Sequence, residues 1–144
     1  MSNFWIKYGS IIAPIISVLL AQIIKVIIQF IKIKKFDIKS IAKNGSMPSG
    51  HASIATSLLI YLIYMYKHHN IDINLVGISL VLWFITLRDA VGVRKMVGKH
   101  SEVLNDLQET DKKLSVNEGH TIPEAIAGII LGILVTIIYI LIVK

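Results

Sequence analysis

The sequence predicts an all-α integral membrane protein, a helical bundle of about four transmembrane helices that forms one domain over residues 1–144. Two observations carry this prediction. Hydrophobic residues make up 54% of the chain and its mean hydropathy is +0.69, which is too apolar for an ordinary soluble domain. The apolar residues also gather into runs that approach the roughly 20 residues needed to cross a bilayer as a helix.

Each of the four runs has its own character. The first is interrupted by Lys25, the second is rich in small residues that favour close helix packing in lipid, and the third is short and ends at Arg88. The fourth contains Gly128-x-x-x-Gly132, a pattern that packs against another helix of this chain or of a second copy, which would make a homo-oligomer. The predicted spans are Ser10 to Ile31, His51 to Tyr66, Leu75 to Leu87 and Pro123 to Val143.

The distribution of basic residues predicts the orientation. Four crossings place loops 32–50 and 88–122 on one side of the membrane, and loop 67–74 with both termini on the other. By the positive-inside rule the first side is cytoplasmic, so we expect a multi-pass protein of the cell (inner) membrane. That side holds Lys32, Lys34, Lys35, Lys39, Lys43, Arg88, Arg94, Lys95, Lys99, Lys112 and Lys113, and the other holds only Lys7, Lys67 and Lys144.

The net charge of +6 is therefore explained by topology and lipid headgroups, and we expect no nucleic-acid partner.

The chain has no cysteine, which excludes thiolate chemistry. Adjacent His68 and His69 do not easily face one ion from a helix and have no carboxylate cluster beside them, so we expect no metal site and no cofactor. Residues 99–118 are polar and mixed in charge, which predicts a surface helix or mobile loop over the cytoplasmic end.

Two short motifs carry most of the functional information. Met47-Pro-Ser-Gly-His51-Ala52 and Gly119-His120-Thr-Ile-Pro-Glu124 each place a histidine where a loop gives way to an apolar run. With four crossings both histidines lie at the cytoplasmic boundary, where two imidazoles can supply acid and nucleophile chemistry. Without the third span they would lie on opposite faces.

The first motif has two interpretations. Pro48 suits the first turn of a helix, and Gly50 lets the backbone amides of Ser49 and Gly50 approach an anion at the helix N-terminus. The alternative is a tight turn capped by Ser46 or Ser49, with His51 as an interfacial residue.

The second motif also has two interpretations. Thr121 to Glu124 fits a capping box with proline at the first helical position. His120 and Glu124 are also four residues apart, so that the carboxylate can accept a hydrogen bond from one ring nitrogen and make the other a better nucleophile.

These residues carry a family resemblance. Pro-Ser-Gly-His followed by a distal His-x-x-x-carboxylate resembles the type 2 phosphatidic acid phosphatase superfamily, which includes vanadium haloperoxidases. A wider pattern, which spans nearly the whole chain, is similar to the divergent small bacterial branch of that superfamily. It comprises Ala21-Gln-Ile-Ile-Lys25, Gly45-Ser-Met-Pro-Ser-Gly-His51, Arg88-Asp-Ala-Val-Gly-Val-Arg94 and Gly119-His-Thr-Ile-Pro-Glu124.

The resemblance implies a metal-independent phosphomonoesterase. His120 would attack phosphorus to form a phosphohistidine, Glu124 would orient it, and His51 would protonate the leaving oxygen. The amides of Ser49 and Gly50 would hold the phosphoryl oxygens together with nearby cations.

The chain departs from the superfamily pattern at three places. It lacks the Lys-x6-Arg-Pro string before His51, it has Lys113-Leu114 where Ser-Arg is usual, and Glu124 stands where aspartate is usual. Phosphate-binding cations must therefore come from other positions.

Lys25 is the first candidate for such a cation, because an ionisable group inside a membrane span is a functional candidate. Snorkelling of its long side chain to the interface is the alternative explanation of a lysine at this position. Arg88 and Arg94 follow, since guanidinium matches phosphate bidentately, and Asp89 would orient either one. The alternative is that the arginines anchor the helix at the membrane interface and that Asp89 forms a surface ion pair with one of them. We favour Arg94 because Gly92 would allow the backbone to turn it inward.

The sequence thus favours a membrane phosphatase acting on a lipid or polyprenyl phosphate that enters from the cytoplasmic leaflet. Two alternatives stay open. One is a non-catalytic protein that binds or transports anionic lipids with the same basic pocket, and the other is a structural membrane subunit.

Overall fold

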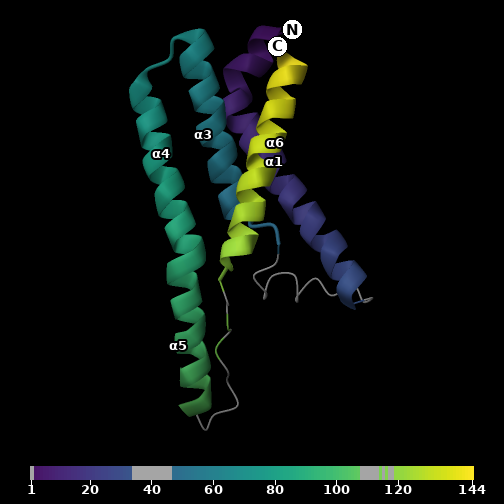
Figure 1. Ribbon diagram of the computed structural model, residues 1–144, viewed down its shortest axis with the longest axis vertical. Coiled ribbons are helices and arrows are strands. Elements are labelled where there is room, and N and C mark those ends of the chain that lie inside the picture. The colour runs from purple at the N-terminus through teal and green to yellow at the C-terminus, as the bar shows by residue number, and fades with distance from the viewer. Residues whose placement is uncertain (1, 34–46, 108–113, 115, 117–118) are drawn as a thin grey trace.

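The computed structural model describes residues 2–33, 47–107, 114, 116 and 119–144, and every regular element in these ranges is helical. This confirms the predicted all-α bundle (Figure 1). The elements, in chain order, are α1 (Ser2–Ile33), α3 (Gly50–His69), α4 (Ile73–Arg88), the π-helical turn η1 (Asp89–Val93), α5 (Arg94–Leu107) and α6 (Ile122–Val143).

Helix α3 is the centre of the bundle. It packs against α1, α4 and α6, whose outer surfaces expose large apolar side chains such as Ile23, Phe84 and Ile130. Small residues of α3 are buried at these contacts, including Ala52, Ser53 and Ser57. The small-residue composition of this span therefore permits three close helix contacts at once.

Buried hydroxyl groups on α3 find partners on each neighbouring helix. The hydroxyls of Ser17 and Ser53 bind each other, Ser57 and Thr136 lie 2.7 Å apart, and the Trp83 indole donates to Thr56 at 2.9 Å. Since a polar group inside a bilayer needs an internal partner, these bonds explain how the most polar span fits there.

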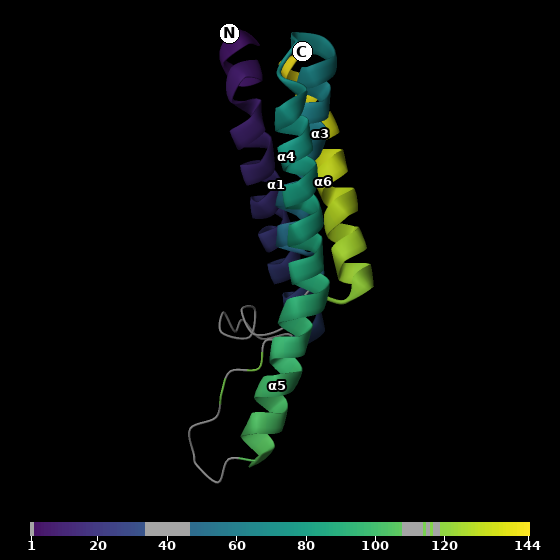
Figure 2. The same cartoon turned by 90° about the vertical axis from the view of Figure 1, so that its left-hand side faces the viewer.

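Within the described part of the chain, three helical segments are long and apolar enough to cross a membrane: Phe4–Ile31, Ile73–Leu107 and Ile122–Val143. Helix α3 has 20 residues and runs beside them (Figure 2). It is less apolar because its neighbours shield it from lipid. Together these helices form the predicted membrane bundle.

The helix of the third predicted span continues past Leu87, where the span was expected to end. The Asp89 amide donates to the carbonyls of Ile85 and Thr86, and the helix continues through η1 into α5. The charge of Asp89 is matched by Arg94 at 2.7 Å, so the charged pair does not break the helix. Figures 1 and 2 show α5 extending beyond the ends of α3 and α6.

The expected polar segment 99–118 is thus partly helical, since α5 includes its first residues up to Leu107. The side chain of Asn105 donates to the Leu114 carbonyl at 3.0 Å and accepts from the Leu114 amide at 2.6 Å. Most of the remainder, residues 108–113, 115 and 117–118, lies outside the described residues.

The Gly128-x-x-x-Gly132 face is occupied within the chain. A Cβ at Gly128 would lie 2.3 Å from the Ser49 carbonyl oxygen, and one at Gly132 would lie 2.5 Å from that of Ser53. Of the two alternatives that the sequence left open, packing against another helix of this chain is the one seen here. A homo-oligomer through these glycines stays a prediction.

Both chain termini lie at one end of the bundle, and α3 and α6 both begin at the other end (Figure 1). His51 and His120 consequently share one end, as the four-span topology predicted. The side of the membrane on which this end lies stays a prediction from the basic loops.

Close packing at Gly132 yields a stability prediction. Gly132→Ala puts a methyl group against the Ser53 backbone, which cannot move as a side chain would, so we expect about 1–3 kcal/mol of destabilisation. Thermal unfolding in detergent micelles measures it. Gly77→Ala is the control, because a Cβ there meets nothing within 4 Å and alanine favours a helix. Equal unfolding temperatures for the two variants would contradict the α3–α6 packing.

Candidate active site

The N-terminus of α3 is fastened to the first turn of α6. The Ser49 amide donates to the Glu124 carbonyl at 3.0 Å, while the Ser49 hydroxyl caps α3 by accepting from the Ala52 amide at 3.4 Å. Ser49 is fully buried. This bond holds the two histidine motifs together.

The contacts of Ser49 therefore differ from the predicted contact with a phosphate. Its amide and hydroxyl are both engaged inside the protein, so its amide does not offer a hydrogen bond to a phosphate oxygen. Gly50 begins α3 and packs against α1, where a Cβ would lie 3.6 Å from the Gln22 side-chain nitrogen. Of the two amides proposed from the sequence, that of Gly50 remains a candidate.

His120 lies in the described segment before α6 and is 8% exposed. Its Nδ1 lies 3.4 Å from Oε2 of Glu124, and the same oxygen accepts the Thr121 amide at 2.9 Å. The two interpretations of Glu124 are therefore both realised, since one carboxylate caps α6 and contacts the imidazole. With Nδ1 directed at Glu124, Nε2 is the nitrogen free to react.

The backbone of His120 is held by the π-helical turn. Its amide donates to the Ala90 carbonyl at 2.9 Å, and Ala90 is fully buried. This contact joins the segment before α6 to the long α4–η1–α5 helix.

The charged groups of four elements converge here. Lys25 of α1 interacts electrostatically with Glu124, His120 and His51. Arg94 of α5 interacts with both imidazoles, and Asp89 of η1 interacts with His51. The two histidines also interact with each other.

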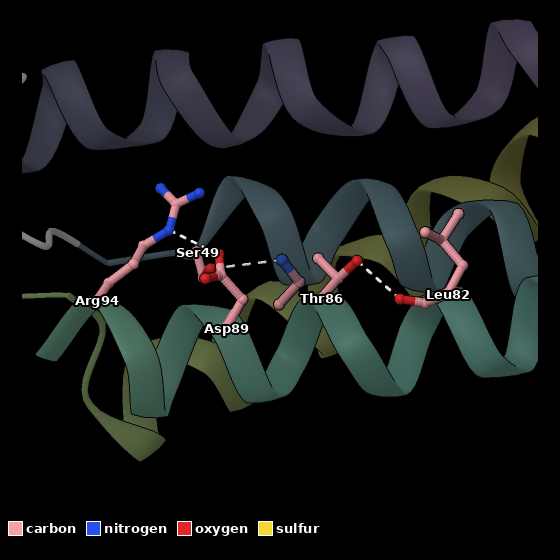
Figure 3. A network of polar contacts seen from close by, with 6 residues as sticks. Ser49, Leu82, Thr86, Asp89 and Arg94 are labelled. Carbon is pink, nitrogen blue, oxygen red and sulfur yellow. Dashed lines mark hydrogen bonds and ion pairs between the residues drawn. The ribbon is translucent and has the colours of Figure 1, made fainter. Parts of the chain in front are cut away.

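Asp89 and Arg94 form the ion pair that sets the guanidinium in place. Arg94 Nε donates to Asp89 Oδ2 at 2.7 Å, and Figure 3 shows this nitrogen facing the Asp89 carboxylate. Asp89 thus orients Arg94. The other two guanidinium nitrogens of Arg94 take no part in this ion pair.

Arg88 is not part of this convergence. It ends α4 as an exposed residue and is not among the charges that act on either histidine. Gly92, the residue expected to turn Arg94 inward, lies within the π-helical turn η1 that directly precedes Arg94.

Lys25 is 9% exposed and forms no ion pair among the residues that the structure describes. Since a buried ammonium with no carboxylate at ion-pair distance is costly, an anionic ligand at this position would stabilise it further than the more distant Glu124 does. Its burial on the inner face of α1 argues against snorkelling to the interface.

Burial lowers the pKa of His120, and the positive charges of Lys25 and Arg94 lower it further, while Glu124 acts in the opposite direction. At neutral pH the imidazole is therefore uncharged, which is the state a nucleophile needs. The positive surroundings thus add to burial in lowering the pKa of His120.

Comparison with known proteins identifies the family of this chain. A family model described as the divergent PAP2 family matches residues 6–135. The chain belongs to this family. It is also 31% identical to the uncharacterized membrane protein YuiD of Bacillus subtilis (strain 168), over 89% of this chain and 91% of that protein. No solved structure matches the chain.

Sequence reasoning missed two contacts that build the site, namely the Ser49–Glu124 backbone bond and the η1 contact to His120. Neither has a side-chain signature, because both are backbone hydrogen bonds between segments far apart in the chain. The adjacent glycine at position 119 was the one available signal, since glycine permits close backbone approach.

Removing a positive or a negative charge near His120 should move its pKa in opposite directions. Lys25→Met removes a cation and should raise the pKa, whereas Glu124→Gln removes the opposing anion and should lower it further. Histidine titration by NMR measures both. Lys67→Met, at the other end of the bundle, should leave the pKa unchanged. Shifts of the same sign for Lys25→Met and Glu124→Gln would contradict the described arrangement.

Proposed function

We propose that this protein is a membrane phosphatase that hydrolyses the phosphomonoester of a lipid or polyprenyl substrate through a phosphohistidine. The single observation that supports it most is the meeting of His51, His120, Lys25 and Arg94 at one end of the bundle. Membership of the divergent PAP2 family supports the same reaction class.

The first half-reaction uses both imidazoles. Nε2 of neutral His120 attacks phosphorus, the ester P–O bond breaks, and protonated His51 transfers its proton to the leaving alcohol oxygen. Glu124 holds Nδ1 of His120 and stabilises the positive charge that forms on the ring. His51 is exposed, so it can reach the oxygen of a bound substrate.

The second half-reaction frees the enzyme. Water attacks the phosphohistidine while neutral His51 accepts one of its protons, and the P–N bond breaks to release phosphate and His120. His51 is then protonated again for the next substrate.

Lys25 and Arg94 supply the positive charge that the phosphoryl oxygens need. Arg94 binds two oxygens in a planar fork, while Lys25 acts as a buried point charge from α1. These residues would replace the basic motif that the chain lacks.

The membrane setting favours a lipid substrate. The site lies at the end of helices whose outer faces carry exposed apolar side chains, so a substrate tail can remain in lipid while its phosphate meets the cations. The excess of basic residues in the two large loops supports a site at the cytoplasmic boundary.

Phosphate release from lipid phosphates, measured with purified protein in mixed micelles containing EDTA, tests this function. The wild type should turn over, and rapid acid-free quenching should trap phosphate on His120. His51→Ala should retain the fold and lose about 10²–10⁴-fold in rate, the usual contribution of a general acid. His120→Ala should form no phosphoenzyme.

Anionic-lipid binding that survives both histidine substitutions, with no turnover by the wild type, would instead identify a lipid-binding or transport protein. Absence of both turnover and lipid binding would favour a structural subunit.

The two arginines make a matched pair for a second test. Arg94→Ala removes a cation that acts on both histidines and should lower kcat/KM about 100-fold, as for other lost transition-state donors. Arg88→Ala removes an exposed arginine of the same helix and should have little effect. A larger loss for Arg88→Ala would contradict the placement of the phosphate site.

A further inference from the structure

The turn between α4 and α5 departs from α-helical geometry beside the candidate site. The Arg94 amide donates to the Asp89 carbonyl, a five-residue spacing that defines a π-helix. A π-helical turn holds one more residue than an α-helical turn, and such turns are frequent at functional sites. Here it carries Asp89 at its start and is followed directly by Arg94.

Gly119 and His120 sit directly on this turn. The His120 amide donates to the buried Ala90 carbonyl at 2.9 Å. A Cβ on Gly119 would lie 2.6 Å from the Lys95 amide nitrogen and 3.0 Å from the Arg94 carbonyl carbon. His120 therefore contacts η1 itself at Ala90, and Gly119 contacts the first turn of α5 at Lys95, directly after η1 ends.

The backbone of Gly119 also has a conformation that other residues rarely adopt. Its φ is +62°, in the left-handed region that glycine occupies without steric cost. Glycine at this position thus satisfies two separate demands, the left-handed backbone and the close approach to Lys95.

We propose that η1 is a positioning element that fixes His120 to the same backbone turn that carries Arg94, with Gly119 and Ala90 as positioning residues. The inference rests on the proposed function, and it adds how the nucleophile and the phosphate-binding guanidinium keep a constant separation. They lie far apart in the chain, but one short backbone contact relates them.

This assignment explains why α4 and α5 form one continuous helix. A flexible loop between them would let Arg94 move independently of His120. Because a displacement of about 1 Å at a reacting group can cost about 100-fold in rate, a rigid link between the two residues has a direct catalytic benefit.

Gly119→Ala tests the proposal in the full-length protein, with Gly77→Ala as the matched control on α4, where a Cβ meets nothing within 4 Å. We expect Gly119→Ala to lower kcat about 100-fold with little change in KM, because Arg94 keeps its partner Asp89 and still binds phosphate. Loss of burial should also raise the pKa of His120, measured by NMR titration. Gly77→Ala should match the wild type in all three quantities.

Amide hydrogen exchange of the wild-type protein provides a second measurement that does not depend on the folding of a variant. The His120 amide lies outside any helix, yet the bond to Ala90 should slow its exchange to a rate typical of helical amides. Fast exchange would overturn the proposal, as would Gly119→Ala with unchanged kcat and an unchanged His120 pKa.

The outcomes also separate this inference from the proposed function. In one outcome the wild type releases no phosphate, its His120 amide is protected, and Gly119→Ala raises the His120 pKa while Gly77→Ala does not. The phosphatase function then fails, and the link between His120 and η1 stands. If the wild type is active while the amide is unprotected, the function stands and the positioning role fails.

Discussion

The close contact between α3 and α6 is the constraint on which the rest of the structure depends. Gly128 and Gly132 let the α6 backbone approach the Ser49 and Ser53 carbonyls, at distances that no side chain would permit. At the end of this contact the Ser49 amide donates to the Glu124 carbonyl. Since His51 and His120 lie within four residues of that bond, the packing of two apolar helices determines where the polar groups meet.

The site in turn depends on a balance of charge at the membrane boundary. Among the described residues, Glu124 and Asp89 are the anions that act on Lys25 and the two histidines, and Arg94 adds to the positive charge. Neutral His120 reduces the repulsion, and a bound phosphate would reduce it further. Burial and this excess of positive charge together lower the pKa of His120.

Much of this arrangement was accessible from the sequence because it follows from spacing along single helices. Apolar run lengths predicted the bundle, and the four-residue spacing of His120 and Glu124 predicted their contact. The continuation of α4 past Arg88 was not predicted, since charged residues at the end of an apolar run resemble a boundary. The bond between the Ser49 amide and the Glu124 carbonyl was not predicted either, because backbone hydrogen bonds between distant segments leave no pattern in side-chain order.

The central claim is that the two histidines meet at one end of the bundle. The chain has no cysteine, so cysteines introduced at positions 51 and 120 would be its only thiols, and spin labels placed there report their separation in bilayers by pulsed electron paramagnetic resonance. The structure predicts one short distance, well below the thickness of the hydrocarbon core. A separation near that thickness, about 30 Å, would place the two positions at opposite faces and contradict the account.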